Sequence, residues 1–345
     1  MIGLDISSSS VKMVELGRDG QGNFVLERCA SEPLDRGWVS DGNIEKFDQV
    51  AEAVRRLIRK SGTKVKDVAM ALPPSAVITK KIVLPAGLRE KDLEVQVEAE
   101  ANQYIPFPLE EVSLDFCVIG PSAVGADSID VLIAASRREK VEDRQGLAEA
   151  AGLNPVVLDV ESYAARMATS RQLDMLPNQG AGLIFALFEV GAFTTRLQVL
   201  RDGEVLYERD QAFGGSQLTQ QIVRQYGFSV DEAEARKRSG DLPEGYLTDV
   251  LQPFVEATGN EIARSLQFFF TSTPHNRVDQ VLLAGGTATL PGFIDAVATQ
   301  TAAPCALLDP FEGMQVRPNL PEDRIRREAP SYLTACGLAM RRFLQ

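Results

Sequence analysis

Alternating apolar and polar positions divide the chain into strands and helices in an α/β order. Residues 1–6 and 11–16 are strand-like and flank the polar run 7–10, which predicts a hairpin. Apolar residues at helical spacing predict a helix over 41–60, and a short apolar stretch at 68–72, ended by two prolines, predicts a buried strand. This order favours an α/β domain over an all-helical one.

The next block, 75–154, reads as a β-rich insert between two parts of one domain. It is predicted to hold strands at 77–83, 113–119 and 128–136, an acidic helix at 89–104 and a helix at 139–151. The chain then returns to the first domain with a strand at 156–160 and a helix at 162–170.

The second half repeats the opening theme of strands around a tight turn. Strands are predicted at 182–190, 194–200, 203–209 and 281–283, and helices at 216–226, 230–239, 247–270 and 331–343. The expected domains are a first core of 1–74 plus 155–177 plus 320–345, the insert 75–154, and a second domain of 178–319 with a small helical subdomain at about 221–260. Because the chain opens inside its first strand, we expect a longer natural N-terminus.

Composition excludes several classes of protein. The chain has 345 residues, 44% of them apolar, which fits about two globular domains. Its formal net charge of -12 disfavours nucleic-acid binding and polybasic attachment to anionic lipid. Four scattered cysteines and a single histidine, His275, argue against a zinc site and a serine-histidine triad.

Candidate chemistry lies in two hairpins, each with an acid at the end of its first strand. Small residues let backbone N–H groups approach an anion, hydroxyls add donors, and the acid can organise hydrated Mg²⁺. The first hairpin carries Asp5, Ser7, Ser8, Ser9, Ser10 and Lys12, and the second carries Glu189, Gly191, Ala192, Phe193, Thr194 and Thr195.

A third motif is a buried strand that ends in Gly285, Gly286 and Thr287. Paired glycines allow a nucleotide's sugar and α-phosphate to approach the backbone closely. Neither the P-loop nor the Rossmann glycine motif occurs in the chain.

These motifs together resemble the actin, Hsp70 and sugar-kinase superfamily. The resemblance implies an α/β, actin-like duplicated two-domain fold with a nucleotide cleft for ATP and Mg. The matching segments, in family order, are 5–12 and 189–195 (phosphate motifs), 159–165 and 335–339 (connecting helices), and 281–288 (adenosine motif).

A narrower resemblance is to the FtsA and MreB branch, and within it to the PilM family of type IV pilus assembly. The run 233–237 is similar to the branch's A-E-x-x-K motif, which implies that Glu234 and Lys237 contact adenine and ribose. The PilM-like runs are 103–111, 213–219, which includes Gly214 and Gly215, and 264–270. The insert then corresponds to an FtsA-type subdomain.

Two departures bear on catalysis. Ser7 stands where the first phosphate motif usually has glycine, and Glu189 stands where the second has aspartate. An extra methylene displaces the carboxylate, so we expect ATP binding, with Mg held by Asp5 and Glu189 through water, but weak or absent hydrolysis. Glu161 is the candidate for placing an attacking water.

The resemblance also implies a partner, the cytoplasmic N-terminal tail of a PilN-like inner-membrane protein. Tyr104, Ile105 and Phe107, held by flanking prolines, are candidates for lining its groove. The chain would then be cytoplasmic and recruited to the inner membrane through this partner. The alternatives left open are a slow actin-like ATPase, an FtsA-like filament former of cell division and a small-molecule kinase.

Overall fold

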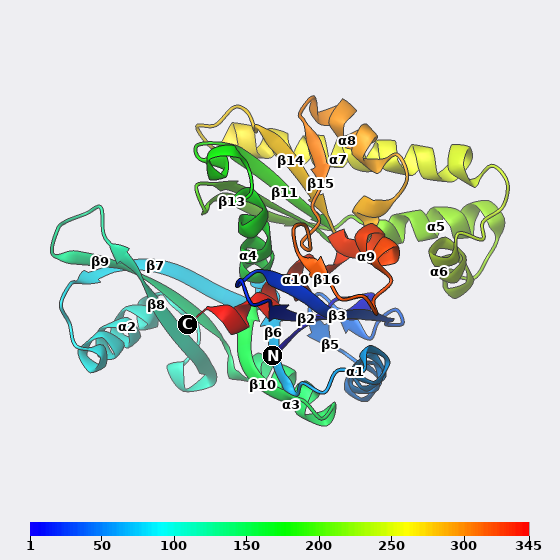
Figure 1. The fold of residues 1–345 in the computed structure, drawn as a ribbon. Helices are drawn as coiled ribbons and strands as arrows, with labels where there is room; N and C mark the ends of the chain where they lie inside the picture. Colours follow the sequence, from blue (N-terminus) through cyan, green and yellow to red (C-terminus); the bar gives the residue numbers. More distant parts are fainter. Residues whose placement is uncertain (345) are drawn as a thin grey trace. The chain divides into compact units, whose positions relative to one another are not determined.

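The computed structural model describes residues 1–344, which form two compact units (Figure 1). The first unit comprises 1–13, 30–164 and the stretch from 338 onward, and the second comprises 14–29 and 165–337. The chain passes between the units within strands β2 (Ser10–Arg18) and β3 (Phe24–Pro33) and within helices α4 (Glu161–Leu173) and α10 (Leu333–Met340).

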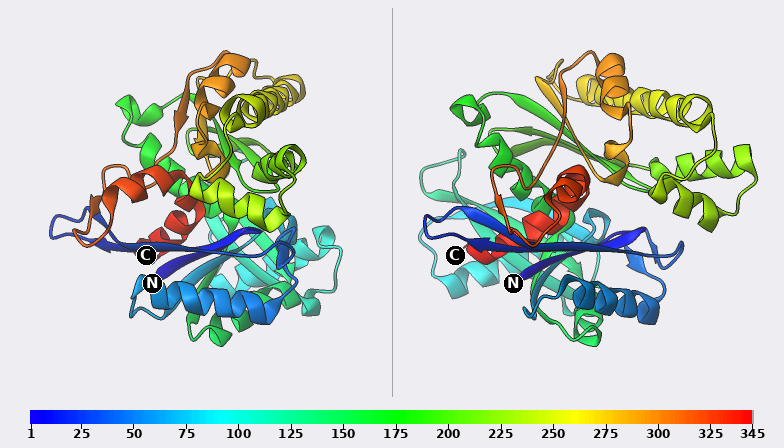
Figure 2. Two further views of the ribbon diagram at one scale, coloured as in Figure 1. Left: turned by 90° about the vertical axis from the view of Figure 1, so that its right-hand side faces the viewer. Right: turned by 45° about the vertical axis from the view of Figure 1, so that its right-hand side comes forward.

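The first unit is built on most of a six-stranded sheet with the order β10-β6-β1-β2-β3-β16, in which the edge strand β16 (Gln315–Val316) pairs in parallel with β3. The strands β1, β6 and β10 are mutually parallel. Helices α1 and α3 pack on this sheet, α1 lying along one face of it (Figure 2), and side chains such as Leu4, Leu57 and Leu147 form the core. The elements are β1 (Ile2–Ile6), β4 (Val39–Ser40), β5 (Asn43–Ile44), α1 (Phe47–Ser61), β6 (Asp67–Leu72), α3 (Arg138–Ala150) and β10 (Asn154–Val160).

The predicted helix at 41–60 is wrong at its start. Val39 pairs with Ile44 in a small hairpin whose turn residues, Asp41 and Gly42, both have positive φ (49° and 77°). Asp-Gly is the preferred pair for such a turn, so local turn chemistry outweighs the helical pattern there. Helix α1 begins at Phe47 and ends at Gly62, a left-handed C-cap.

The insert forms its own small layer of strands and one helix. Strands β7 and β8 both pair with β9, and α2 covers one face, with Val97, Val131 and Ile133 in a separate core. The elements are η1 (Pro74–Ala76), β7 (Val77–Pro85), α2 (Glu90–Tyr104), η2 (Leu109–Glu111), β8 (Val112–Pro121) and β9 (Ser128–Arg137). The strands and helix predicted for this block are confirmed.

The second unit contains a five-stranded sheet, β13-β12-β11-β14-β15. One face of it packs on α5, α7 and α8 through large side chains such as Phe188, Phe254 and Phe293. The elements are η3 (Pro177–Gly180), β11 (Ile184–Val190), β12 (Thr195–Arg201), β13 (Glu204–Gln211), α5 (Gly215–Tyr226), α6 (Val230–Ser239), η4 (Leu247–Leu251), α7 (Gln252–Ser272), β14 (Gln280–Ala284), η5 (Gly286–Thr289), α8 (Phe293–Thr301), β15 (Cys305–Leu307), β16 (Gln315–Val316), α9 (Glu322–Glu328) and η6 (Ala329–Tyr332). The last short helix, η7 (Arg341–Phe343), belongs to the first unit.

The two sheets share one topology. Five strands of each sheet follow the same order. With β6 and β14 counted as the fourth strand and β10 and β15 as the fifth, and with the small strands β4, β5 and β16 left aside, both sheets run fifth, fourth, first, second, third. In each half the first strand is parallel to the fourth, β1 to β6 and β11 to β14. The duplication predicted from the repeated hairpins is therefore confirmed.

Candidate functional site

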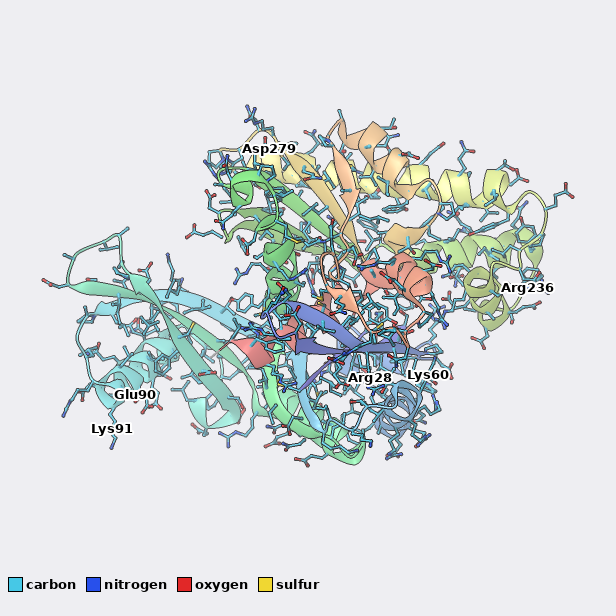
Figure 3. All side chains as sticks on the ribbon, in the orientation of Figure 1. Arg28, Lys60, Glu90, Lys91, Arg236 and Asp279 are labelled. Atoms are coloured by element: carbon cyan, nitrogen blue, oxygen red, sulfur yellow. The ribbon has the colours of Figure 1, made fainter. Side chains whose placement is uncertain are left out.

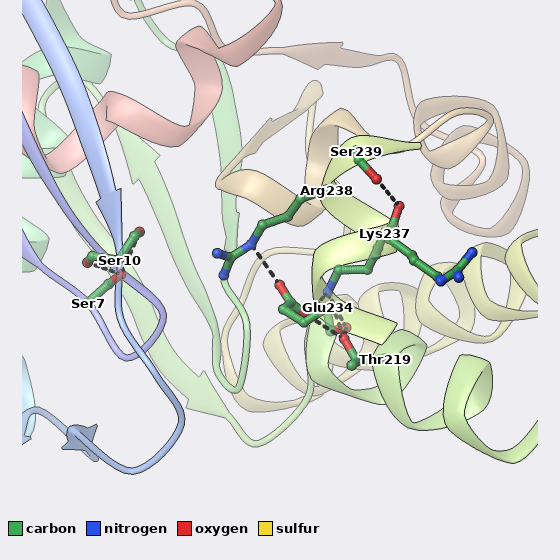
Figure 4. Close-up of polar contacts among 9 residues, drawn as sticks. Ser7, Ser10, Thr219, Glu234, Lys237, Arg238 and Ser239 are labelled. Atoms are coloured by element: carbon green, nitrogen blue, oxygen red, sulfur yellow. Dashed lines mark hydrogen bonds and ion pairs between the residues drawn. The ribbon is translucent and has the colours of Figure 1, made fainter. Parts of the chain in front are cut away.

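The first hairpin turn is closed by serine hydroxyls and backbone. Ser7 donates its N–H to the Ser10 carbonyl at 3.0 Å and its hydroxyl to the same oxygen at 2.9 Å (Figure 4). Its φ is not positive, so serine replaces the family's glycine without backbone strain. Ser8 and Ser9 are half-buried residues of the turn, and their contact with a ligand stays a prediction.

Asp5 and Lys12 face each other across this hairpin. The Lys12 ammonium lies 3.5 Å from the Asp5 carboxylate, and both side chains are mostly buried. One cation and one anion at a turn of small residues suit a phosphate group whose charge is shared with a metal ion. Glu161, the first residue of α4, is half-buried and belongs to the same unit.

The second hairpin turn is closed by a backbone hydrogen bond, and glycines of neighbouring segments pack against it. Gly191 donates its N–H to the Thr194 carbonyl at 3.0 Å. Thr195 uses its hydroxyl to hold the Phe213 carbonyl at 2.9 Å, so the turn is tied to the chain entering α5. Ala192 and Phe193 form the tip between them.

Gly214 and Gly215 bring the start of α5 onto this turn. The N–H of Gly215 donates to the Gly191 carbonyl at 3.0 Å, and that of Ser216 donates to the Ala192 carbonyl at 2.7 Å. A Cβ at Gly214 would lie only 2.4 Å from the Gly191 oxygen. Glycine is required here because the protein's own backbone is too close for any side chain.

The end of β14 meets the same turn. Thr287 donates its hydroxyl to the Gly191 carbonyl at 2.8 Å. Gly285 has a φ of 88°, and a Cβ there would lie 2.4 Å from the Val190 oxygen. The second phosphate motif, the paired glycines before α5 and the adenosine motif, which were separate in the sequence, therefore converge.

Gly286 differs from the other glycines of this site. It is exposed, and no atom of the described residues lies within 4 Å of the position a Cβ would take. Packing does not require glycine at this position. The open space is what close approach of a ligand would need.

Glu234 and Lys237 form a compact polar network with the first turns of α5. The Lys237 ammonium lies 2.6 Å from the Glu234 carboxylate, 2.7 Å from the Thr219 hydroxyl and 3.4 Å from the Gly215 carbonyl (Figure 4). The network ties α6 to the glycine site. Contact of Glu234 and Lys237 with adenine and ribose stays a prediction.

Burial raises the pKa of Glu234, but the charge and hydrogen bond of Lys237 and the hydroxyl of Thr219 outweigh it, so the pKa lies below its ordinary value. Thr219 ends the PilM-like run 213–219 but was not predicted as a site residue; its position four residues after Gly215, on the same helix face, is the signal that could have pointed to it.

The Glu189 side chain contacts helix α10. One of its carboxylate oxygens accepts a hydrogen bond from the Thr334 hydroxyl of α10 at 3.2 Å, and Glu189 lies opposite Arg196 in the strand pairing. The longer side chain thus reaches a helical hydroxyl. Thr334 is a second residue that the sequence motifs did not single out.

The acidic residues suit only a magnesium ion that keeps most of its water. Within residues 1–344, no cluster of three or more histidine, cysteine, aspartate or glutamate side chains could hold a metal ion. Mg²⁺ in nucleotide sites commonly uses one or two carboxylates together with phosphate oxygens and water. Contact of Asp5 and Glu189 with a magnesium ion through water stays a prediction.

The three candidates for partner contact differ in exposure. Tyr104 is 45% exposed, with the Lys80 ammonium 4.8 Å from its ring centre, whereas Ile105 is 8% exposed and belongs to the core of the insert. Phe107 is half-buried, and the Arg137 guanidinium lies 4.1 Å from its ring centre. The acidic helix α2 before them begins with exposed side chains, among them Glu90 (Figure 3).

Comparison with solved structures defines the class of protein: the chain has an actin-like ATPase fold. It matches MreB 5 of Spiroplasma citri bound to AMPPNP with 13% identity and a TM-score of 0.50, over 99% of this chain and 96% of that one. It matches the PilM-PilN type IV pilus biogenesis complex with 28% identity and a TM-score of 0.79, over 99% of this chain and 97% of that one.

The model of the family described as type IV pilus assembly protein PilM matches residues 3–343, so the chain belongs to the PilM family. A curated relative, the ethanolamine utilization protein EutJ of Salmonella typhimurium, is 26% identical over 119 residues, which are 34% of this chain and 38% of that protein. The chain thus spans well under half the length of the curated relatives it matches. In residues 1–344, no helix is long and apolar enough to cross a bilayer.

Proposed function

We propose that this chain is an ATP-binding, actin-like scaffold of type IV pilus assembly that binds the cytoplasmic N-terminal tail of a PilN-like inner-membrane protein. The observation that carries the proposal is the likeness, over 99% of the chain, to the solved PilM-PilN complex. The family match over residues 3–343 favours this function over an FtsA-like division filament. The partner would recruit the chain to the inner face of the inner membrane.

Nucleotide binding is supported by the cradle of the second unit. Gly286 leaves open space, while Gly214, Gly215 and Gly285 let three backbone segments meet at the turn of Gly191. Each hairpin turn is proposed to bind phosphate oxygens by itself, the first through its N–H groups and the hydroxyls of Ser8 and Ser9, the second through its N–H groups. The bound metal ion would shield phosphate charge, with Asp5 orienting its water.

We propose that hydrolysis is weak or absent. The Glu189 carboxylate is committed to the Thr334 hydroxyl, and its extra methylene moves it away from the position an aspartate would take. Glu161 is the residue proposed to place a water. Turnover far below the roughly 1–100 per second of efficient phosphoryl-transfer enzymes is expected in a steady-state assay, and rapid turnover lost in Glu161→Ala would contradict a scaffold role.

Calorimetry with MgATP tests the nucleotide part of the proposal. We expect the parent to bind, and Asp5→Asn, which keeps the shape and removes the charge, to weaken the Mg-dependent affinity by about tenfold or more, equivalent to roughly 1.4 kcal/mol. Chromatography of nucleotide released from the purified, denatured protein gives an independent reading. A folded parent that fails to bind millimolar ATP would disprove this part.

Calorimetry with a synthetic PilN tail peptide tests the partner part. Tyr104→Ala removes an exposed anchor and is expected to cost about 1–4 kcal/mol of binding energy with little change in the melting transition. Val95→Ala is the matched control because Val95 is 65% exposed on the same helix, α2, away from the predicted contact run. If both variants lose the same amount of peptide-binding energy, or if neither loses any, the peptide binds elsewhere.

A further inference from the structure

Strand β13 forms one edge of the sheet in the second unit. In the order β13-β12-β11-β14-β15 it is the outermost strand, and among the described residues it pairs only with β12 (Figure 1). An edge strand presents a row of backbone N–H and C=O groups with which a further strand can pair. Neither the candidate nucleotide motifs nor the insert uses this edge.

The side chains of β13 alternate between the two faces of the sheet. Tyr207 points toward helix α7, because its ring centre lies 5.7 Å from that of Phe269. Side chains two positions apart in a strand share a face. Arg209 therefore lies on the α7 face as well, whereas Glu208 and Asp210 lie on the opposite face.

Three consecutive exposed residues of β13 carry alternating charges, Glu208, Arg209 and Asp210. The two acidic side chains have polar neighbours on β12: Asp210 lies 3.0 Å from the Arg196 guanidinium, and Glu208 lies 3.5 Å from the Gln198 amide. Opposite charges placed directly across two strands stabilise the pairing, and like charges destabilise it. The complement of this edge is therefore a strand with a basic, an acidic and a basic residue.

Arg209 has an aromatic neighbour but no acidic one. Its guanidinium lies 4.5 Å from the ring centre of Phe268 on α7, and within residues 1–344 it forms no ion pair with a carboxylate. Phe268 is 42% exposed, although it belongs to the run 264–270 of an otherwise well-packed helix. An acidic side chain opposite Arg209 would supply the missing counter-charge, and the side chains two positions away from it would cover the Phe268 ring.

The edge strand ends beside an open cavity of about 330 Å³. Its polar lining includes Gln211 at the end of β13, Gln217 of α5, and Thr258 and Glu261 of α7. A strand that continues past the charged run would place its next side chain opposite Gln211, on the α7 face. The cavity therefore suits a hydrogen-bonding side chain at that position.

We propose that β13 is a docking site for an extended segment of a protein partner, which joins the sheet as an additional strand. Its basic, acidic and basic side chains lie opposite Glu208, Arg209 and Asp210. The site goes beyond the proposed nucleotide and tail-peptide functions and would let the scaffold hold a second protein. Another copy of this chain is a poor occupant, because pairing with Arg209 of both copies opposite each other sets like charges together at all three positions.

The test is calorimetry of the whole chain with synthetic peptides of about ten residues, a usual strand length. Their central runs, flanked by threonine and valine, are Lys-Glu-Lys, the reordered Lys-Lys-Glu, and Lys-Lys-Lys. We expect the parent to bind the Lys-Glu-Lys peptide at least about tenfold more tightly than either of the others. The reordered peptide has the same net charge, so this preference separates strand pairing from general attraction to an acidic protein.

Arg209→Glu turns the edge into three consecutive acids and should reverse the preference. Affinity for the Lys-Glu-Lys peptide should fall by about tenfold or more, and the Lys-Lys-Lys peptide should become the tightest ligand. Arg224→Glu is the matched control: Arg224 is an exposed arginine of α5, so the variant has the same change in net charge and should keep the parent's preference.

Hydrogen exchange gives a readout that needs no variant. Exchange of residues 204–211 in the parent should slow when the Lys-Glu-Lys peptide is added, and this measurement decides the matter if Arg209→Glu does not fold. Equal affinities for the three peptides, protection only outside β13, or an unchanged preference in Arg209→Glu would overturn the proposal. A parent dimer that Arg209→Glu dissociates in sedimentation would assign the edge to a second copy and overturn it as well.

Discussion

The two hairpins occupy matching places in the duplicated fold but are built by different means. In the first, the turn is closed by the hydroxyl and N–H of Ser7, both on the Ser10 carbonyl. In the second, the turn at Gly191 is held from outside by Gly215 and Thr287. The second turn also has a local bond from the Gly191 N–H to the Thr194 carbonyl, and the first also accepts a bond on the Ser9 carbonyl from the Leu34 N–H. The two therefore differ in how closely other backbone packs on them, and that packing is tightest at Gly214 and Gly285 of the second.

This difference teaches where each hairpin is vulnerable. A turn closed by its own hydroxyl loses one hydrogen bond when that hydroxyl is removed, which is a small loss. A Cβ at Gly214 or Gly285 would lie 2.4 Å from a backbone oxygen of the second hairpin, so neither position can accept even a methyl group without moving a strand or a helix. Substitutions should therefore separate the two hairpins by the size of their effects.

The largest effect is expected from Gly285→Ala. The new methyl group would lie 2.4 Å from the Val190 oxygen, on a residue with a φ of 88°. Overpacking and left-handed strain together should lower the free energy of unfolding by about 3 kcal/mol in urea titration. Gly227→Ala is the control, because Gly227 has a φ of 72° but open space around it, and should cost about 1 kcal/mol. Equal losses would mean that the close approach at Gly285 is not real.

Gly286→Arg should weaken MgATP binding and leave the free energy of unfolding nearly unchanged. Its side chain would enter the open space next to Gly285, so the affinity for MgATP should fall by about 100-fold or more, equivalent to roughly 2.7 kcal/mol. The free energy of unfolding should stay within about 0.5 kcal/mol of the parent's value, as for substitutions at other exposed positions. A variant that binds MgATP as the parent does would show that the ligand does not use this space.

The network behind the second hairpin should give a smaller, pH-dependent effect. The pKa of Glu234 is lowered in the folded chain, so its stabilising contribution is fully present above its ordinary value of about 4.5 and is lost as the pH falls through the folded-state pKa. Glu234→Gln should cost about 1–2 kcal/mol at pH 6, and the difference from the parent should shrink toward pH 3. Parallel stability curves over this range would contradict the network's role.

The smallest effect is expected at the first hairpin. Ser7→Ala removes the hydroxyl bond to Ser10 but keeps the backbone bond, and should cost about 0.5–1 kcal/mol in thermal unfolding. Ser8→Ala is the matched control, since among the described residues the Ser8 hydroxyl makes no hydrogen bond, and its stability should equal the parent's. A loss at Ser7 as large as that at Gly285 would remove the contrast between the hairpins.

The strands and the duplicated order could be predicted because both depend on local patterns. The apolar residues of 1–6 and the nearly continuous apolar run of 184–190 mark buried strands, and small residues after each mark the turns. Errors arose where turn chemistry and apolar spacing pointed in different directions, as at Asp41 and Gly42, whose positive φ values form a turn and delay the start of the helix to Phe47. Local rules compete there, and pairing of β4 with β5 decides between them.

The sequence by itself determined the fold class, the order of the motifs and the glycines at which backbone must come close, because each follows from residue type and short-range periodicity. Only the tertiary structure decided which glycines serve packing and which leaves space, since Gly285 and Gly286 are adjacent and identical in sequence. It also decided that Thr219 and Thr334 contact site residues, because their hydrogen bonds connect residues brought together by long-range strand and helix packing, which no local pattern encodes.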